Sequence, residues 1–345
     1  MKIAVVNNCV PFISGGAEHL AESLSDQLVQ RGHEAMVIRI PFQWQPPERI
    51  IDHVLACRLL NFSGVDRVIG LKFPAYLVPH ENKVLWLLHQ FRQAYDLWGT
   101  PYQDLPGAAD GVRIREVIIE ADNQYLREAR SIYTLSPVTV ARLKKFNGLN
   151  SEVLFHPLNR SDHFFCSDYG DYIFYPSRIT RGKRQALVVE SMKHTKSPVR
   201  LVIGGQPELA SDRETIEHII RDAKLESRVD FLPRFLSEEE KANLFAGSLG
   251  CAYTPYDEDS YGYVTLEAYH SRKPVITCTD SGGTTILVKD GDTGLVVTPS
   301  PQAIGEAMDR LYEDRTSARR MGEAGYDLMN TLKINWDTVV ERLTA

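Results

Sequence analysis

Two acidic side chains, Asp259 and Glu267, stand eight residues apart in the chain. The apolar run 249–253 before them is typical of a buried strand, and residues 263–270, after Gly262, are typical of a short helix. Asp259 therefore lies in a loop at the carboxyl end of a strand, where open α/β sheets collect ligands. One carboxylate can accept from both vicinal hydroxyls of a ribose while helix-terminal N–H groups receive a diphosphate. This spacing indicates a sugar-nucleotide site; the alternative is two solvated acids favoured by the start of a helix.

The sequence from Asp259 to Ala268, followed by Lys273-Pro-Val-Ile, resembles the acid-x7-Glu signature of the family 4 retaining glycosyltransferases, also called group 1, which have the GT-B fold. That family usually has Glu where this chain has Asp259, so the charge is kept and the side chain is shorter by one methylene. The resemblance implies that Asp259 meets the hydroxyls of the transferred sugar and that the donor is bound by Gly262, Tyr263, Val264, Thr265 and Glu267, with Glu267 on the ribose.

A basic pair, Arg178 and Lys183, resembles the Arg-x4-Lys motif of the same family. Glycosyl transfer builds negative charge on the leaving diphosphate, and a guanidinium with an ammonium can stabilise that charge without a metal. We therefore expect Arg178 and Lys183 to be catalytic, and we expect no metal or other cofactor. Asp257-Glu258-Asp259 also spells D-x-D, an oxygen-ligand pattern that suits a divalent cation, and this is the metal-dependent alternative.

The first half of the chain offers weaker candidates. Gly15-Gly16 follows the apolar run 3–6 at the place of the glycine pair of the family, although a tight structural turn explains it as well. His89 directly follows the expected strand 83–88; the family commonly has a histidine here that touches the donor sugar, and the alternative is a core histidine. The aromatic stretch 91–102 is either an acceptor platform or a loop packed on its own rings.

Hydrophobic periodicity predicts two α/β series. Residues 3–6, 34–40, 67–70, 83–88 and 151–155 read as strands of the first, and residues 172–176, 200–203, 229–232, 249–253 and 274–278 as strands of the second. We predict an α/β GT-B fold of two Rossmann-like doubly wound domains facing across a cleft. The expected domains are an acceptor-side domain at 1–165, completed by a C-terminal helix at about 333–345, and a nucleotide-sugar donor domain at 166–332.

Composition excludes several classes of protein. The 345 residues carry a formal charge of -6, which argues against a nucleic-acid binder, although Arg and Lys cluster between 113 and 145. Five widely spaced cysteines indicate free thiols in a reducing cytoplasm. We expect neither a secretory signal nor a transmembrane segment, because no apolar run approaches the roughly 18 residues that a span needs. Peripheral contact with a membrane stays open.

The predicted activity is a metal-independent, retaining transfer of a hexose from a nucleotide diphosphate sugar to a hydroxyl acceptor, which is a glycan, a glycolipid or a small molecule. A sugar-nucleotide epimerase of the same fold is one alternative, and a non-catalytic sugar-nucleotide-binding protein is another. The second is kept because Asp259 departs from the family and because Ser281-Gly282-Gly283 continues to Ile286 where the family has Glu. A nicotinamide oxidoreductase is disfavoured, since GxGxxG is absent after both candidate first strands.

Overall fold

The computed structural model describes residues 1–11, 15–105 and 109–345, which group into two compact units. The first unit is Met1–His156 together with Asn335–Ala345, and the second is Pro157–Ile334. The chain therefore passes between the units twice, at 156–157 and at 334–335. Residues 157–165, which we expected in the first domain, group with the second unit.

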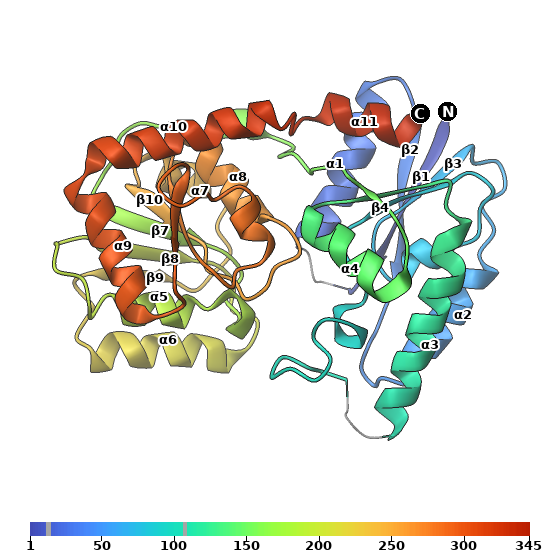
Figure 1. Ribbon diagram of the computed structural model, residues 1–345, viewed down its shortest axis with the longest axis horizontal. Helices are drawn as coiled ribbons and strands as arrows, with labels where there is room; N and C mark the ends of the chain where they lie inside the picture. Colours follow the sequence, from blue (N-terminus) through green and yellow to red (C-terminus); the bar gives the residue numbers. More distant parts are fainter. Residues whose placement is uncertain (12–14, 106–108) are drawn as a thin grey trace. The chain divides into compact units, whose positions relative to one another are not determined.

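The first unit contains a parallel sheet of the order β2-β1-β3-β4-β5-β6 within the described residues (Figure 1). Its strands are β1 (Lys2–Cys9), β2 (Glu34–Pro41), β3 (Arg67–Gly70), β4 (Lys83–Leu87), β5 (Ser131–Thr134) and β6 (Glu152–Val153). Its helices are α1 (Gly16–Gln30), α2 (Arg49–Leu59), α3 (Ala109–Tyr125), α4 (Pro137–Asn147) and α11 (Trp336–Thr344). Successive residues of β1 point to opposite sides of the sheet, and these residues are apolar on both sides. Helices therefore cover both faces of the sheet. Ala4 and Val6 pack with α2 and α3, and Ile3 and Val5 pack with α1 and α11.

The C-terminal helix α11 is a structural part of the first unit. Trp336 packs edge-on against Trp86 of β4 with ring centroids 6.1 Å apart, and Arg67 of β3 donates a hydrogen bond of 2.8 Å to the carbonyl oxygen of Leu343. The amphipathic segment 336–343 thus returns to the first sheet, although 276 residues separate Leu343 from Arg67 of β3.

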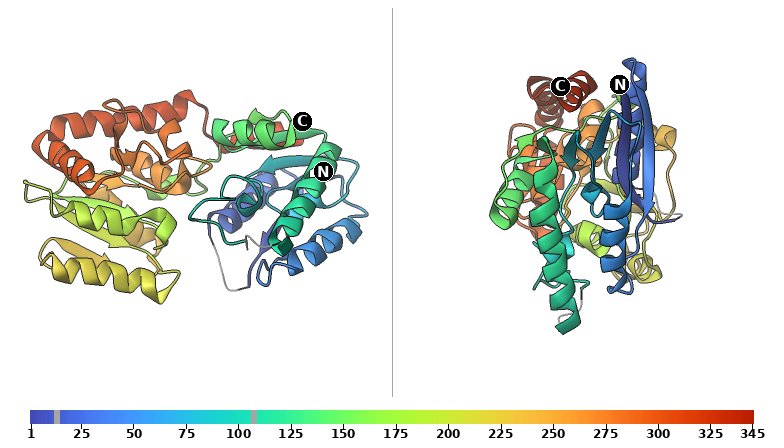
Figure 2. Two further views of the ribbon diagram at one scale, coloured as in Figure 1. Left: turned by 60° about the horizontal axis from the view of Figure 1, so that its bottom comes forward. Right: turned by 90° about the vertical axis from the view of Figure 1, so that its right-hand side faces the viewer.

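The second unit repeats the arrangement, with a parallel sheet of the order β12-β11-β10-β7-β8-β9 within the part of the chain that the structure describes. Its strands are β7 (Tyr172–Pro176), β8 (Arg200–Gly204), β9 (Val229–Leu232), β10 (Gly250–Ala252), β11 (Val275–Cys278) and β12 (Gly294–Val297). Its helices are α5 (Gln185–Ser191), α6 (Ala210–Asp222), α7 (Glu238–Ala246), α8 (Gly262–His270), α9 (Pro301–Glu313) and α10 (Arg315–Thr331). Helix α5 packs between α6 and α9 on one face, and α8 between α7 and α10 on the other (Figure 2).

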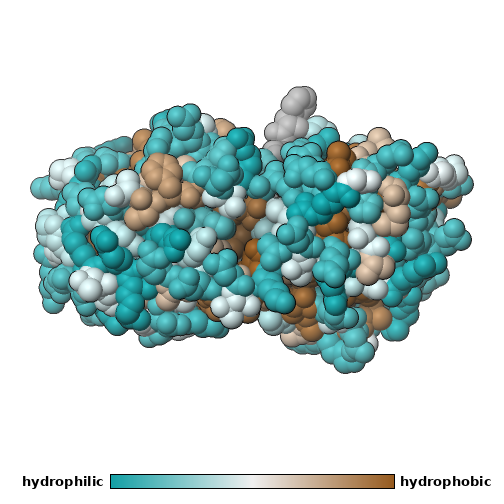
Figure 3. Space-filling model, turned by 90° about the horizontal axis from the view of Figure 1, so that it is seen from above, coloured by the Kyte–Doolittle hydropathy of each residue, from teal (hydrophilic) through white to brown (hydrophobic). Residues whose placement is uncertain are grey.

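The order of strands and helices agrees with most of the sequence-based assignment and departs from it in five places. Helices α2 and α3 and strands β5 and β12 were not expected. The strand expected at 151–155 is reduced to Glu152–Val153. Among the described residues no helix is both long enough and apolar enough to cross a bilayer. The face drawn in Figure 3 is largely hydrophilic.

A buried polar network ties the unexpected helix α3 to the loop after β4. The fully buried carboxylate of Asp122 accepts hydrogen bonds from the hydroxyls of Tyr95, at 2.7 Å, and Tyr76, at 3.1 Å. The Tyr95 hydroxyl in turn accepts from the side-chain amide of Asn147, which also accepts from Gln90 at 2.7 Å. Burial raises the pKa of Asp122 to about 7, although both tyrosine hydroxyls act in the opposite direction.

This raised pKa predicts a pH-dependent loss of stability. In the unfolded chain Asp122 loses its proton near pH 4, whereas in the folded chain it keeps the proton up to about pH 7. Stability from this group is therefore complete below pH 4 and is lost as the pH rises to 7, by roughly 4 kcal/mol in total. Asp122→Asn imitates the protonated form, so the difference in unfolding free energy between wild type and variant should change by about 3 kcal/mol between pH 4.5 and 7.5.

Urea unfolding at both pH values measures the difference. Asp110→Asn, an exposed substitution on the same helix, is the matched control and should give a difference that is nearly independent of pH. If the two variants show the same pH dependence, Asp122 is ionised in the folded protein across this range.

Candidate functional site

The two acids of the first motif lie on the expected strand-to-helix connection between β10 and α8. Both carboxylates are largely buried: Asp259 is 7% exposed and Glu267, in the second turn of α8, is 5% exposed. Glu267 forms an ion pair with Lys241 of α7, a partner that the sequence pattern did not reveal. Burial of the two acids argues against the alternative of solvated residues at a helix start.

The N-terminal turn of α8 presents backbone rather than side-chain groups. Gly262 has a φ of 75°, and a Cβ at this position would lie 2.7 Å from the ring and hydroxyl of Tyr253. Val264 and Thr265 are buried, and the Thr265 hydroxyl donates to the carbonyl oxygen of Tyr261 at 2.6 Å. What these residues, with Tyr263, can offer an anion is therefore the first N–H groups of the helix.

Lys183 reaches the acidic loop although 75 residues separate it from Glu258. It closes the short helix η5 (Arg181–Lys183), where the Thr180 hydroxyl accepts from the Lys183 amide at 3.2 Å. The Lys183 ammonium donates to the Tyr253 hydroxyl at 2.9 Å and forms an ion pair with Glu258. Burial raises the pKa of Tyr253, so its hydroxyl stays protonated and accepts from the ammonium.

Arg178 is the more open member of the basic pair. Its side chain is 53% exposed, and its guanidinium lies 3.5 Å from the carboxylate of Glu208. Its carbonyl oxygen accepts a hydrogen bond of 3.0 Å from the buried side chain of Gln185, which fixes the backbone of the motif. Arg178 thus carries a solvent-exposed guanidinium on a turn whose backbone is fixed.

Arg184, directly after the motif, connects the surrounding loops. Its guanidinium forms a two-point ion pair with Asp280, with both N···O distances 2.7 Å, and it donates to the carbonyl oxygens of Thr254 at 2.7 Å and Pro255 at 2.8 Å. Although burial lowers the pKa of Arg184, the hydrogen bonds and charge of Asp280 hold it above its usual range. Arg184 has a φ of 60°, a conformation that L-residues other than glycine rarely adopt.

The turn 281–283 is hydrogen-bonded to the acidic loop along the backbone. Glu258 donates its N–H to Ser281 at 3.3 Å and accepts from the N–H of Gly283 at 2.7 Å. Gly282 has a φ of 60°, and a Cβ there would lie 2.5 Å from the carbonyl oxygen of Glu258. Ile286, which stands where the family has Glu, ends the short helix η6 (Gly283–Ile286) and is half-buried.

The candidates of the first half lie in the other unit. Gly15 and Gly16 follow β1, and His89 follows β4, so all three stand at the carboxyl edge of that parallel sheet. Gly15 has an extended φ of -154°, and its N–H donates to Glu18 at 2.9 Å. His89 Nδ1 lies 2.5 Å from the carbonyl oxygen of Gln90; since a carbonyl only accepts, Nδ1 carries the proton. The part of the Gly15 turn at 12–14 lies outside the described residues.

The aromatic stretch 91–102 is packed largely within its own unit. Phe91 packs against Phe73 and Phe42 with ring centroids 5.3 and 5.9 Å apart, and Tyr95 is buried. Arg115 lies over the ring of Trp98 at 5.2 Å. The rings thus support the alternative of a loop packed on its own aromatics.

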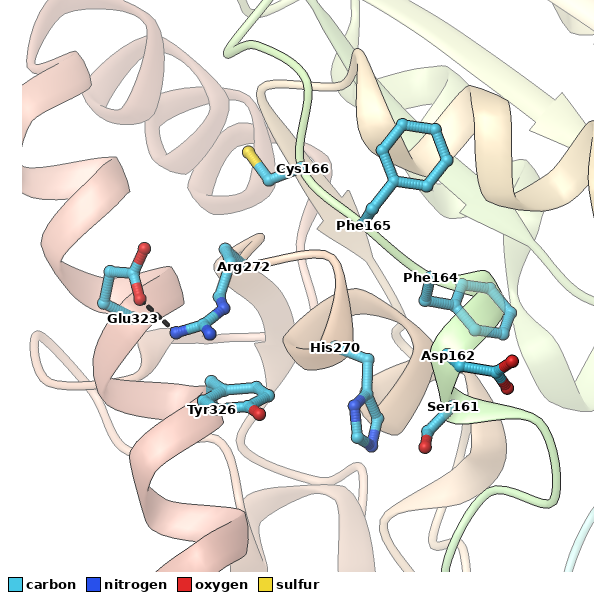
Figure 4. A pocket seen from close by; sticks show the side chains of 9 residues that line it. All are labelled: Ser161, Asp162, Phe164, Phe165, Cys166, His270, Arg272, Glu323 and Tyr326. Carbon is cyan, nitrogen blue, oxygen red and sulfur yellow. Dashed lines mark hydrogen bonds and ion pairs between the residues drawn. The ribbon is translucent and has the colours of Figure 1, made fainter.

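An open pocket of about 620 Å³ lies at the far end of α8 from Gly262 (Figure 4). Its wall includes His270, which ends α8, and Arg272, whose guanidinium lies 3.5 Å from the Tyr326 ring centroid and forms an ion pair with Glu323. The charge of Arg272 is thus already neutralised, and no residue of the two predicted motifs lines this pocket. In the described part of the chain no three His, Cys, Asp or Glu side chains are grouped as a metal site requires.

The sequence did not reveal five residues that complete the site. Glu258 and Tyr253 contact Lys183, Lys241 forms an ion pair with Glu267, and Arg184 forms an ion pair with Asp280. Glu258 was considered only as the middle letter of D-x-D. The signal that could have singled out Arg184 is a long basic side chain directly after the motif lysine, but its partner is 96 residues away.

Comparison with known proteins agrees with the geometry. Residues 167–328 match the family described as "Glycosyl transferases group 1". The chain is 24% identical to O-antigen chain mannosyltransferase C of Escherichia coli, over 91% of this chain and 89% of that protein. It is 29% identical to a GDP-mannose-dependent alpha-(1-6)-phosphatidylinositol monomannoside mannosyltransferase of Mycobacterium tuberculosis over 48% of this chain, but the match spans only 44% of that protein.

Among solved structures, the Anabaena protein Alr3699/HepE in complex with UDP-glucose superposes with a TM-score of 0.75, covering 100% of this chain and 98% of that one at 15% identity. At this identity the likeness is one of fold. The predicted fold class, α/β with two Rossmann-like units of the GT-B type, is confirmed.

Two substitutions of Arg184 separate the effect of its guanidinium contacts from the effect of its positive φ. Arg184→Ala and Arg184→Gly both remove the guanidinium and leave Asp280 without its cation, so each should lower the unfolding free energy by about 3 kcal/mol. Only alanine keeps the strain of the positive φ, so the alanine variant should be less stable than the glycine variant by roughly 1 kcal/mol. Urea unfolding of both variants measures the two effects; equal stabilities would mean that residue 184 leaves the left-handed conformation once the guanidinium is removed.

Proposed function

We propose that this chain, whose residues 167–328 match the group 1 glycosyltransferases, transfers a hexose from a nucleoside diphosphate sugar to a hydroxyl acceptor, without a metal ion and with retention of configuration. The observation that carries the proposal is the meeting of the two motifs in the second unit. Lys183 lies against Tyr253 and Glu258, and Glu258 directly precedes Asp259 in the loop that leads into α8. A cation and a helix N-terminus on one loop are what a diphosphate requires.

Two parts of this site bind different parts of the donor. The first N–H groups of α8, from Gly262 to Thr265, receive the diphosphate, and the buried carboxylate of Glu267 accepts from the ribose hydroxyls. The ion pair with Lys241 fixes the orientation of the Glu267 carboxylate before the donor arrives. The relatives favour a mannosyl donor, since one that matches over nearly its whole length is a mannosyltransferase.

Bond breaking is assisted by the basic pair. As the bond from the anomeric carbon to the phosphate oxygen breaks, Lys183 and Arg178 stabilise the charge that develops on the diphosphate. In a front-face reaction the leaving phosphate oxygen helps to remove the acceptor proton, so the protein needs no nucleophile. Asp259 then orients the hydroxyls of the sugar. For Gly15, Gly16 and His89 of the first unit, contact with the donor stays a prediction from the sequence.

We place the enzyme in the cytoplasm. Its five cysteines, Cys9, Cys57, Cys166, Cys251 and Cys278, are all free thiols, which suits a reducing compartment.

Nucleotide binding is the first test. We expect one of UDP, GDP and ADP, in the presence of EDTA, to raise the thermal transition of the wild type by some 5 to 10 °C at 100 times its dissociation constant. Glu267→Gln keeps the shape of the side chain but cannot accept with two charged oxygens, so it should lose most of this shift. Glu217→Gln removes a negative charge from the remote helix α6, and this variant should keep the thermal shift. A shift by NAD alone, or by none of the nucleotides, would sink the proposed function.

The rate of transfer tests the basic pair. Removing one charged donor from such a site costs roughly 3 kcal/mol of transition-state stabilisation, so Lys183→Ala should lower kcat by about two to three orders of magnitude. Arg178→Ala should have the smaller effect, because its side chain is half exposed and screened by water. The measurement is sugar transfer with the nucleotide that passes the first test, with and without EDTA. Loss of the wild-type rate in EDTA would favour the D-x-D metal alternative.

A further inference from the structure

The positive charges of the proposed donor site are neutralised within the second unit before any donor binds. Arg178 faces Glu208, Lys183 faces Glu258 and Arg184 faces Asp280. These three cations and three carboxylates sum to zero net charge. A nucleoside diphosphate sugar carries about two negative charges on its phosphates, so its entry leaves the group with about two excess negative charges, and the withdrawal of one carboxylate halves this excess.

The geometry indicates which carboxylate withdraws. Asp280 is held by two hydrogen bonds of 2.7 Å from a guanidinium that also fixes two carbonyl oxygens, so its removal would undo the loop. Glu208 lies 3.5 Å from Arg178, and both side chains are about half exposed, so water and salt already weaken that pair. Glu258 shields the cation that is expected to meet the phosphate, in a pair whose side chains are only 19% and 26% exposed.

Glu258 is also built to release its side chain alone. Its backbone is fixed to the turn 281–283 by one hydrogen bond in each direction. The loop therefore keeps its shape while the side chain rotates about its own bonds. Lys183 retains the Tyr253 hydroxyl at 2.9 Å, so the ammonium stays in place when Glu258 leaves.

We infer that Glu258 is an internal competitor of the donor: its carboxylate occupies the Lys183 ammonium in the empty site and is displaced by the diphosphate. This inference rests on the proposed function and adds to it a residue that sets donor affinity by opposing binding. Removing the negative charge of Glu258 should therefore increase the affinity for the ligand, whereas removing an acid that binds the ligand would decrease it.

Calorimetric titration with UDP and GDP tests the inference. Glu258→Gln keeps the size of the side chain and can still accept from Lys183, but it leaves the ammonium without a counter-charge. We expect the dissociation constant of the accepted nucleotide to fall about ten-fold, and binding to become more sensitive to added NaCl because a net attraction now contributes. Inorganic pyrophosphate should show the same direction of change, since the effect belongs to the phosphates and not to the base.

Glu217→Gln changes the net charge of the unit equally but lies on α6, paired with Arg213, and should leave the dissociation constant within two-fold of wild type. If the wild type binds a nucleotide and Glu258→Gln binds it equally or more weakly, Glu258 does not oppose binding, and the inference is wrong while the proposed function stands. If no nucleoside diphosphate binds to either protein, the proposed function and this inference fall together. If Glu217→Gln also strengthens binding, the cause is overall charge and not displacement of Glu258.

Discussion

The arrangement of the second unit depends on the guanidinium of Arg184. One planar group binds the carboxylate of Asp280 at two points and two carbonyl oxygens of the loop after β10. It thereby joins three segments that the chain reaches separately: the end of η5, the loop at 254–255 and the residue before the turn 281–283. Because these contacts hold residue 184 at a positive φ, the preceding Lys183 is aimed at Tyr253 and not along the axis of α5.

Other residues of the site also combine a hydrogen-bonded backbone with a side chain that can change its conformation. Gln185 holds the carbonyl of Arg178, and the turn at Gly283 holds Glu258, while both side chains remain partly exposed. Glu267 is the opposite case, a buried carboxylate with a lysine partner on the neighbouring helix. A rigid acid suits a ribose, whose hydroxyls have fixed geometry, whereas a solvent-exposed guanidinium such as that of Arg178 can follow a diphosphate whose charge shifts during the reaction.

The sequence predicts those parts of the fold whose signal is local. Strand β7 and the pair Asp259 and Glu267 follow from apolar runs and from a motif contained in nine residues. Helix α3 was missed because its polar and charged residues, with Asp122 fully buried, obscure the helical period; its inner face is completed by Tyr76 and Tyr95. The partners Glu258 and Lys241 were missed because an ion pair between residues 26 or 75 positions apart leaves no periodic trace.

The departures of this chain from the family pattern fit the site that the structure shows. Asp259, one methylene shorter than Glu, is largely buried beside a loop that already carries Glu258, so a retracted acid limits repulsion between neighbouring carboxylates. Ile286 ends η6 half-buried, where the family has a further acid. Ile286 removes one negative charge that would face an incoming diphosphate, whereas Asp259 keeps its charge and holds it one methylene further back. As inferred for Glu258, its carboxylate balances Lys183 in the empty site and turns away when the diphosphate arrives, which leaves the Lys183 ammonium to attract the phosphates.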